Sequence, residues 1–457
     1  MARFFLLLFL CLLMLAAVYR LDNRGMIPSD LPRMPYLQQV SGSSAIIAWR
    51  MVDGKNEKLK PLVSWRIEPP KDSSNPPAWN LITESEAISM VPGFLDYSVQ
   101  ISGLPEHSLI EYTVTIDGNS IGEGTFLSAM GKESDETMRI WVLGDSGTGK
   151  SAQFNVLSEM ESHLNTLGPD GRIDLMLHVG DMAYSHGTNG EFTARFFRPY
   201  SHLLSEFPCW PAIGNHEVKS SSVETESGPY FDAYLLPRNG ESGGYPSGTE
   251  AYYSFDNGPV HFISIDSSGA KITADSPMVE WLKKDLAQQD KKWCIVFMHH
   301  PPYSLGTHTS EDSNDSYGRL VAVRELLLPI LEGGGVDLFL AGHSHCYERS
   351  SLIKGVYGYG ESPNFGIPNR ETLRSDGKIL SENAAQYDLG TEGGTLYVVV
   401  GHGGASSRVN GKHPVMEVAD PRHGSVLLTI DKNNLVLENI VVGQGVTDTV
   451  KLTQPTP

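Results

Sequence analysis

The stretch VLGDSGTGKS, from Val142 to Ser151, decides how the fold of the following 300 or so residues is interpreted, because it fits two different structures. Its letters satisfy the pattern G-x-x-x-x-G-K-[ST], in which backbone amides and a lysine, here Lys150, hold nucleotide phosphates. The same letters contain a D-x-G turn from Asp145 to Gly147, whose carboxylate can hold a metal ion. The loop alone does not choose between a nucleotide-binding fold and a metal-binding one.

Composition excludes some classes of protein. The chain has 457 residues, 40% of them hydrophobic and 19% charged, which suits a globular protein of two or three domains. Its formal net charge of −19 argues against non-specific nucleic-acid binding, which needs a basic surface. We therefore expect no nucleic-acid partner. Bound metal cations are one source of the local positive charge that an anionic substrate requires.

Residues 1–22 are predicted to be a targeting segment. Arg3 precedes an uncharged, apolar run from Phe4 to Val18, as in a secretory signal peptide. The run is shorter than the ~20 apolar residues of a typical membrane span. A cleaved signal and a secreted, extracellular or periplasmic location are favoured. An uncleaved anchor, which would attach the protein to a membrane, stays open because no A-x-A cleavage site follows.

Residues 28–130 are predicted to form an all-β sandwich. Short strand-like runs such as SAIIAWRM, PLVSWRI and LIEYTVTID are separated by Gly, Pro, Ser and Asn turns. The stretch ISGLPEHSLIEYTVTI resembles the end of a fibronectin type III domain, although Ile110 stands where that family usually has a tyrosine.

Residues 138–450 are predicted to form an α/β domain. Continuous apolar runs, among them RIWVLG, IDLMLHVG, WCIVFM and VDLFLAG, alternate with helix-like stretches such as SAQFNVLSEMESHL. Such runs are typical of strands buried on both faces. The stretch YYSFDNGPVHFISID predicts a hairpin that turns at Asn257-Gly258.

Metal-ligand side chains follow the ends of five of these predicted strands. They are Asp145 in GDSG, Asp181 and Tyr184 in GDMAY, Asn215 and His216 in GNHE, His299 and His300 in VFMHHPPYS, and His343 and His345 in AGHSHCYER. In open α/β sheets these strand ends meet in one crevice, where ligands bind. Carboxylate and imidazole are metal ligands. His343 and His345 are two residues apart, so an extended backbone would point both the same way. Glycine beside each ligand lets the backbone turn sharply.

In order, these blocks are D-x-G, G-D-x-x-Y, G-N-H-[DE], V-x-x-H and G-H-x-H, and together they resemble the metallophosphoesterase superfamily. Tyr184, and YER after the last block, make the chain similar to the purple acid phosphatases. The resemblance implies two sheets flanked by helices, behind an N-terminal sandwich as in the plant members.

The resemblance also implies a binuclear metal centre. One ion, typically Fe(III), would be held by Asp145, Asp181, Tyr184 and His345. The second, an Fe, Zn or Mn ion, would be held by Asp181, Asn215, His299 and His343. His216 would face the substrate phosphate and leaving group, and His308 stands near the place of the family's other substrate histidine, in a loop that departs from the plant pattern. The reaction implied is hydrolysis of phosphate monoesters by metal-bound hydroxide.

Other functions stay open at this point. The same site would suit a phosphodiesterase or nucleotide hydrolase, the Lys150 loop a P-loop NTPase, and the sandwich a non-catalytic cell-surface binding protein. Small phosphorylated molecules are the expected substrates. The oligomeric state and the roles of His300, His186 and His402 are undecided.

Overall fold

The structure is a computed structural model. It describes residues 32–53, 61–70, 76–82, 87–88, 93–168, 171–358, 367–382 and 385–455. The predicted targeting segment at residues 1–22 lies outside these ranges. Among the described residues, no helix is long and apolar enough to cross a bilayer.

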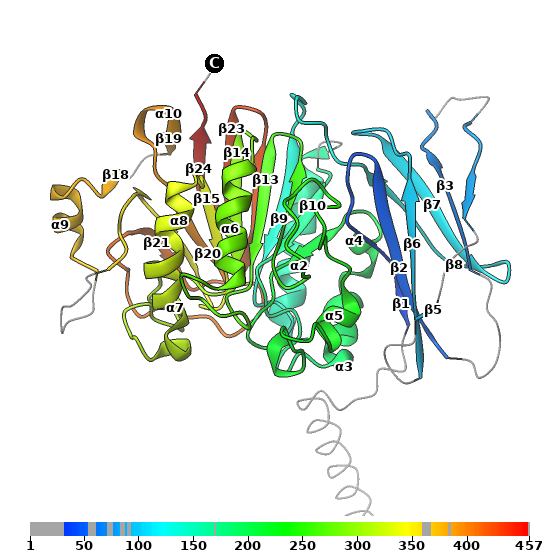
Figure 1. The fold of residues 1–457 in the computed structure, drawn as a ribbon, viewed down its shortest axis with the longest axis horizontal. Helices are drawn as coiled ribbons and strands as arrows, with labels where there is room; N and C mark the ends of the chain where they lie inside the picture. Colours follow the sequence, from blue (N-terminus) through cyan, green and yellow to red (C-terminus); the bar gives the residue numbers. More distant parts are fainter. Residues whose placement is uncertain are drawn as a thin grey trace, which may run out of the picture.

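Two four-stranded antiparallel sheets form the N-terminal part (Figure 1). One is ordered β1 (Arg33–Gln38), β2 (Ser44–Val52), β6 (Phe94–Ser102) and β5 (Ala87–Ile88); the other is ordered β4 (Asn80–Ile82), β3 (Pro61–Ile67), β7 (Leu109–Ile116) and β8 (Asn119–Leu127). Every second residue of β7 is buried, and Trp49 of the opposite sheet shares its core. These sheets form a β-sandwich, while assignment to the fibronectin type III family stays a prediction.

Two seven-stranded sheets form the rest of the molecule. The first is ordered β11 (Cys209–Pro211), β10 (Leu175–His178), β9 (Met138–Leu143), β22 (Gly424–Ile430), β23 (Asn434–Val441), β24 (Gly445–Thr453) and β19 (Gln386–Asp388). The second is ordered β12 (Tyr253–Asn257), β13 (Val260–Ile265), β14 (Trp293–Met298), β15 (Leu338–Ala341), β20 (Leu396–Val400), β16 (Tyr347–Ser350) and β21 (Met416–Asp420). A small sheet pairs β17 (Leu352–Ile353) with β18 (Ile379–Ser381). The predicted hairpin is present as β12 and β13, with Asn257 paired to Val260.

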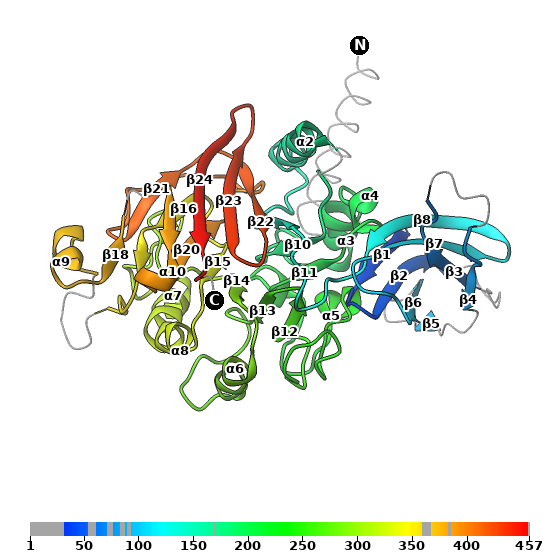
Figure 2. The same cartoon turned by 90° about the horizontal axis from the view of Figure 1, so that it is seen from above.

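Helices cover the outer faces of the two sheets, as Figure 2 shows with α2 on one side and α6 and α8 on the other. The described α-helices are α2 (Ser151–Thr166), α3 (Asn189–Phe192), α4 (Ser201–Leu204), α5 (Pro229–Ala233), α6 (Pro277–Gln288), α7 (Arg319–Ala322), α8 (Leu328–Gly333), α9 (Arg370–Ser375) and α10 (Leu389–Glu392). Two π-helices, Thr193–Phe197 and Val323–Leu327, and two 3-10 helices, Glu217–Lys219 and Asp315–Gly318, are also present. In α6 the Ser276 side chain caps the first turn and Pro277 occupies the first helical position. The predicted arrangement of two sheets flanked by helices is confirmed.

The central strands are buried on both faces, which explains their continuous apolar sequences. In β13, Phe262 belongs to the core between the two sheets, whereas Ile263 packs in the cluster that includes Leu282 of α6. The strands β9 and β10, and likewise β13, β14 and β15, run parallel. Their carboxyl ends therefore lie on one edge of the molecule.

The sandwich is docked onto the α/β part through a shared core. Tyr36 and Ala48 of the sandwich lie in the same apolar cluster as the strands of the first large sheet. The fully buried side chains of Arg33 and Arg50 both donate to Asn189 Oδ1, from Arg33 Nη2 at 2.8 Å. Because Asn189 opens α3, the sandwich contacts the segment that follows the GDMAY block directly.

A buried ion network joins the β12–β13 hairpin to α6, and we expect it to make stability depend on pH. His261 Nδ1 lies 2.7 Å from an Asp256 oxygen, and Nε2 lies 2.9 Å from an Asp285 oxygen. Burial alone would lower the His261 pKa, but the hydrogen bonds to both carboxylates raise it to about 9. The stabilisation is thus complete below the unfolded-state pKa of ~6.5 and is lost as the pH rises through about 9.

Replacing His261→Gln tests this dependence. At pH 6 the variant should lose about 3 kcal/mol of unfolding free energy relative to the wild type, and this difference should shrink towards zero by about pH 10. Chemical denaturation of both proteins across that pH range measures it. A difference that stays constant with pH would contradict the expectation.

Candidate metal centre

The predicted ligand residues occupy the loops at the shared edge of the parallel strands. Asp145, Asp181 and His343 follow β9, β10 and β15, and each has a left-handed backbone, with φ of 54°, 60° and 66°. Such angles are uncommon for residues other than glycine and cluster at functional sites. The expectation that neighbouring glycines make the sharp turns is confirmed at Asp181, where Gly180 also has a positive φ of 94°. It is wrong at Asp145 and His343, where the ligand residue itself, and not a glycine beside it, takes the left-handed conformation.

Glycine beside the ligands also lets the site loops approach each other closely. A Cβ atom added to Gly147 would lie 1.7 Å from the Met182 carbonyl oxygen. One added to Gly180 would lie 2.5 Å from His299 Nδ1. Any side chain at these positions would push apart the loops that carry the predicted ligands.

Asp145, Tyr184 and His345 form one half of the site. Tyr184 Oη donates to Asp145 Oδ1 over 2.9 Å and lies 3.1 Å from His345 Nε2. The other ring nitrogen of His345, Nδ1, donates to the Ser406 carbonyl over 3.1 Å. In a neutral ring this leaves the lone pair of Nε2 facing the phenol and the carboxylate.

Asn215, His299 and His343 form the other half. Asn215 Oδ1 lies 2.8 Å from His299 Nε2 and 2.9 Å from His343 Nδ1, and these two nitrogens are 3.2 Å apart. His299 Nδ1 donates to the Val179 carbonyl over 2.9 Å. Asp181 lies beside this half, with Oδ1 3.5 Å from His299 Nε2.

These donors fit a metal centre. In its neutral form His299 turns the lone pair of Nε2 towards the amide oxygen of Asn215, and two acceptors this close repel each other unless a proton or a cation lies between them. Ligand atoms of Asp145, Asp181 and His299 all lie within 4.8 Å of one another, and all three residues are buried. A cation would relieve the cost of burying the two carboxylates. The structure therefore brings all seven predicted ligands together, while their coordination of particular ions stays a prediction.

Tyr184 needs such a cation in order to ionise. Burial, followed by the charges of Asp145 and Asp181, raises the pKa of the Tyr184 phenol well above its ordinary value. The phenol therefore keeps its proton unless a strongly positive ion offsets that field.

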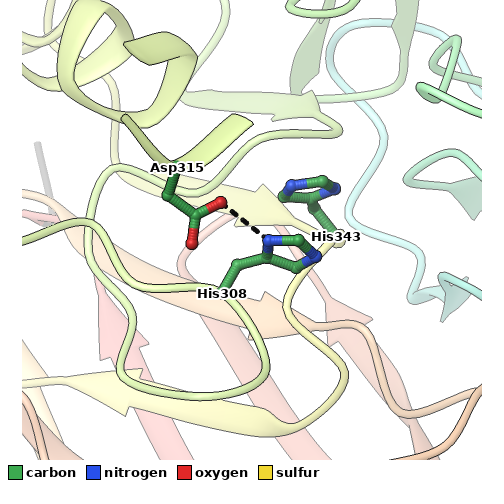
Figure 3. A group of neighbouring side chains, drawn as sticks. All are labelled: His308, Asp315 and His343. Carbon is green, nitrogen blue, oxygen red and sulfur yellow. Dashed lines mark hydrogen bonds and ion pairs between the residues drawn. The ribbon is translucent and has the colours of Figure 1, made fainter. Parts of the chain in front are cut away.

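The two predicted substrate histidines lie beside the ligands. His216 Nε2 is 3.7 Å from Asp181 Oδ2, and its Nδ1 donates to the Ser185 carbonyl over 2.7 Å. The His308 ring stacks on His343 with centroids 3.9 Å apart, and Nδ1 lies 2.8 Å from Asp315 Oδ1 (Figure 3). Side-chain exposures of 19% for His216 and 34% for His308 leave both rings accessible to a substrate.

Three histidines of undecided role have different places. His300 is buried, with Nδ1 3.0 Å from Ser267 Oγ and its ring packed against His343. His186 is exposed. His402 is fully buried with Nε2 2.9 Å from Asn439 Oδ1, so it presents no surface to a substrate.

The expectation of an extended backbone between His343 and His345 is wrong, because His343 is left-handed. The two rings therefore do not point the same way by simple alternation. Instead, His343 joins the half that contains Asn215, and His345 joins the half that contains Tyr184.

Sequence reasoning missed Glu217, which holds the site loops together. Its buried carboxylate accepts hydrogen bonds from the amides of Asp181 over 2.8 Å, Gly214 over 2.9 Å and Ala183 over 3.1 Å. Burial, and then the charge of Asp181, raises the Glu217 pKa to about 8. The signal was available, because Glu217 is the last letter of GNHE.

The P-loop letters do not form a phosphate cradle. The amide of Gly147 donates to the Asp181 carbonyl, that of Thr148 to the Ser146 carbonyl, and that of Gly149 to the Gln153 side chain. These amides are engaged within the chain and unavailable to a phosphate. Lys150 is exposed at the start of α2.

Comparison with known proteins agrees with this geometry. Residues 138–347 match the family model described as Calcineurin-like phosphoesterase. The chain contains a calcineurin-like phosphoesterase domain. It is 31% identical over 252 residues to purple acid phosphatase 15 of Arabidopsis thaliana, which covers 49% of this chain and 42% of that protein. It is 27% identical over 256 residues to probable inactive purple acid phosphatase 9 of the same plant, covering 48% and 37%. The chain thus spans less than half the length of these curated relatives.

A solved structure extends the likeness of fold beyond the phosphoesterase domain. The purple acid phosphatase PPD1 from yellow lupin (Lupinus luteus) seeds superposes with a TM-score of 0.71, covering 93% of this chain and 75% of that one. The sequence identity is 20%, so this match concerns the fold.

Replacing Glu217→Ala should destabilise the domain, because it leaves three amides without their acceptor. Each buried amide left without an acceptor lowers the free energy of unfolding by about 1–3 kcal/mol. Chemical denaturation of the metal-free protein measures the loss, with the exposed Glu224→Ala as the matched control. Equal unfolding free energies for the two variants would contradict the role given to Glu217.

Proposed function

We propose that this protein is a binuclear-metal phosphatase that hydrolyses phosphate monoesters of small molecules. The observation that carries the proposal is the convergence of seven ligand-type side chains on one edge of the two sheets, in the pairs of contacts described above. The proposed ligands are Asp145, Asp181, Tyr184 and His345 for an Fe(III) ion, and Asp181, Asn215, His299 and His343 for an Fe, Zn or Mn ion. Asp181 is the shared ligand.

Two such ions supply an activated water at moderate pH and polarise the phosphoryl oxygens. The chain's own residues do the rest. His345 and His299 are oriented by the backbone carbonyls that their Nδ1 atoms bond, so their Nε2 atoms face the centre. His216 is held by the Ser185 carbonyl with Nε2 towards the site, where it can bind the phosphate and stabilise the departing oxygen. His308 lies close enough to the same centre to share that task.

The engaged amides of the Asp145 loop disfavour a P-loop NTPase, because they leave no nest for a phosphate. A phosphodiesterase would use the same ions and remains the nearest alternative. A non-catalytic surface protein would not need so complete a set of ligands, but one relative is named probable inactive, so activity has to be measured.

The remaining assignments are part of the same proposal. Residues 1–22 are a cleaved signal peptide or an anchor, residues 28–130 a fibronectin type III-like sandwich, and residues 138–450 the catalytic domain. The protein is proposed to be secreted, extracellular or periplasmic.

Replacing His299→Ala should lower kcat/KM for 4-nitrophenyl phosphate at least ~100-fold, equivalent to about 2.7 kcal/mol of transition-state stabilisation. The reason is the loss of a ligand from one half of the site. Chelation of the wild type should abolish the activity and metal addition should restore it. Lys150→Ala is the control and should retain activity.

The alternatives give different results in the same assay. ATP hydrolysis that is lost in Lys150→Ala and kept in His299→Ala would establish the NTPase instead. Faster hydrolysis of bis(4-nitrophenyl) phosphate than of the monoester would establish the diesterase.

Iron-loaded wild type should show a visible charge-transfer band, as the resemblance to the purple acid phosphatases implies for a phenolate bound to Fe(III). The band should disappear in Tyr184→Phe, which lacks the phenolic oxygen. His186→Phe, at an exposed position two residues away, is the control and should keep it. Iron-loaded protein without the band would remove the Fe(III)–tyrosinate assignment and leave a Zn or Mn phosphatase.

A further inference from the structure

Asp315 and Ser316, in the segment between β14 and α7, contact two imidazoles of the site at once. Ser316 Oγ lies 2.6 Å from His343 Nε2 and donates to Asp315 Oδ1 over 2.7 Å. The same Asp315 oxygen lies 2.8 Å from His308 Nδ1 (Figure 3). The four groups therefore form one continuous hydrogen-bonded chain.

The direction of each hydrogen bond follows from the chemistry of the groups. A carboxylate only accepts, so the single hydroxyl proton of Ser316 points to Asp315. The Ser316 oxygen can then only accept from His343, which places the His343 proton on Nε2. The lone pair of His343 is left on Nδ1, the atom that faces Asn215 Oδ1 at 2.9 Å and His299 Nε2 at 3.2 Å.

The loop takes up a costly conformation to make these contacts. Ser316 and Tyr317 are both left-handed, with φ of 52° and 58°, and Gly318 follows at 76°. Tyr317 is fully exposed, so its side chain does not explain the conformation through packing. Asp315 is anchored independently, because its Oδ2 accepts from the Thr309 amide over 2.8 Å. Strain of this kind persists where the surrounding contacts fix it.

We propose that Asp315 and Ser316 are positioning residues that select the ring nitrogen which His343 presents to a metal ion. The inference rests on the proposed function only in taking His343 as a ligand. Partners of this kind, hydrogen-bonded to the far nitrogen of a ligating histidine, typically contribute 10–100-fold in metal affinity. The same chain links His343 to His308, so the loop holds a metal ligand and a substrate-facing ring in one unit.

The test compares three variants of the full chain for zinc binding. Ser316→Ala removes the hydroxyl and keeps the Cβ atom, whereas Ser316→Gly removes the hydroxyl and suits the left-handed backbone. Tyr317→Gly is the matched control, because it also places glycine at a left-handed position and leaves the Ser316 hydroxyl in place. Zinc bound per chain is measured after equilibration with buffers of graded free zinc concentration.

Both Ser316 variants should need 10–100-fold more free zinc than the wild type to hold one of two ions, while the other ion is retained. Tyr317→Gly should match the wild type. Selective loss of one ion, with an unchanged unfolding midpoint of the metal-free Ser316→Gly variant, separates positioning from general damage to the fold.

Several results would overturn the inference. They are equal zinc affinity in all three variants, loss in Ser316→Ala but not in Ser316→Gly, and a third ion in the wild type that the Ser316 variants lack. A third ion of this kind would mean that His308, Asp315 and His343 form a separate metal site. Activity towards 4-nitrophenyl phosphate is read in parallel. A wild type that holds two ions but hydrolyses nothing, whether loaded with zinc or with iron and zinc, overturns the proposed function and leaves the zinc comparison valid. A wild type that binds neither zinc nor iron overturns both.

Discussion

The left-handed backbone of Asp145, Asp181 and His343 is the constraint on which the site depends. These residues lie just after strands that belong to two different sheets, and a sharp turn in each loop keeps the side chain at the shared edge. Non-glycine residues hold this conformation only when other contacts fix them. Here the fixing contacts are hydrogen bonds from backbone amides: the amide of Asp145 donates to the Gly180 carbonyl, and the amide of His343 donates to the side-chain oxygen Asp145 Oδ2.

The buried carboxylate of Glu217 also fixes the site loops. A single carboxylate accepts from amides of the loops after β10 and β11, so these two loops cannot move independently. Its burial is expensive, as its raised pKa shows. The fold accepts that cost and fixes the position of Asp181, the residue proposed as the shared ligand.

The sequence was sufficient to predict the strands and the residues that gather at their ends. Strands such as β13 and β14 are buried along their whole length, so their sequences are continuously apolar, and polar residues interrupt these runs abruptly. It was insufficient where the deciding contacts are between distant loops. The left-handed conformation of Asp181 and the three bonds to Glu217 have no local signal beyond the letters GNHE. Ser316 lies in a loop without periodicity, and nothing in its neighbours indicates a contact with His343. The position of His402 in a glycine-rich stretch was misleading. This stretch does contact His345 through the Ser406 carbonyl, but His402 itself is buried away from the site and pairs with Asn439.

The contact between the sandwich and the large sheets could not be predicted from sequence patterns either. Arginine is usually a surface residue, but Arg33 and Arg50 are buried at this junction. Both hold Asn189, and two residues later Glu191 accepts from the amides of Ser185 and His186, directly after Tyr184. The position of the Tyr184 oxygen is thus set partly by arginines of the sandwich. The residue proposed to bind Fe(III) is therefore tied to the junction between the sandwich and the large sheets, so a change at this junction would alter the site without replacing any of its ligands.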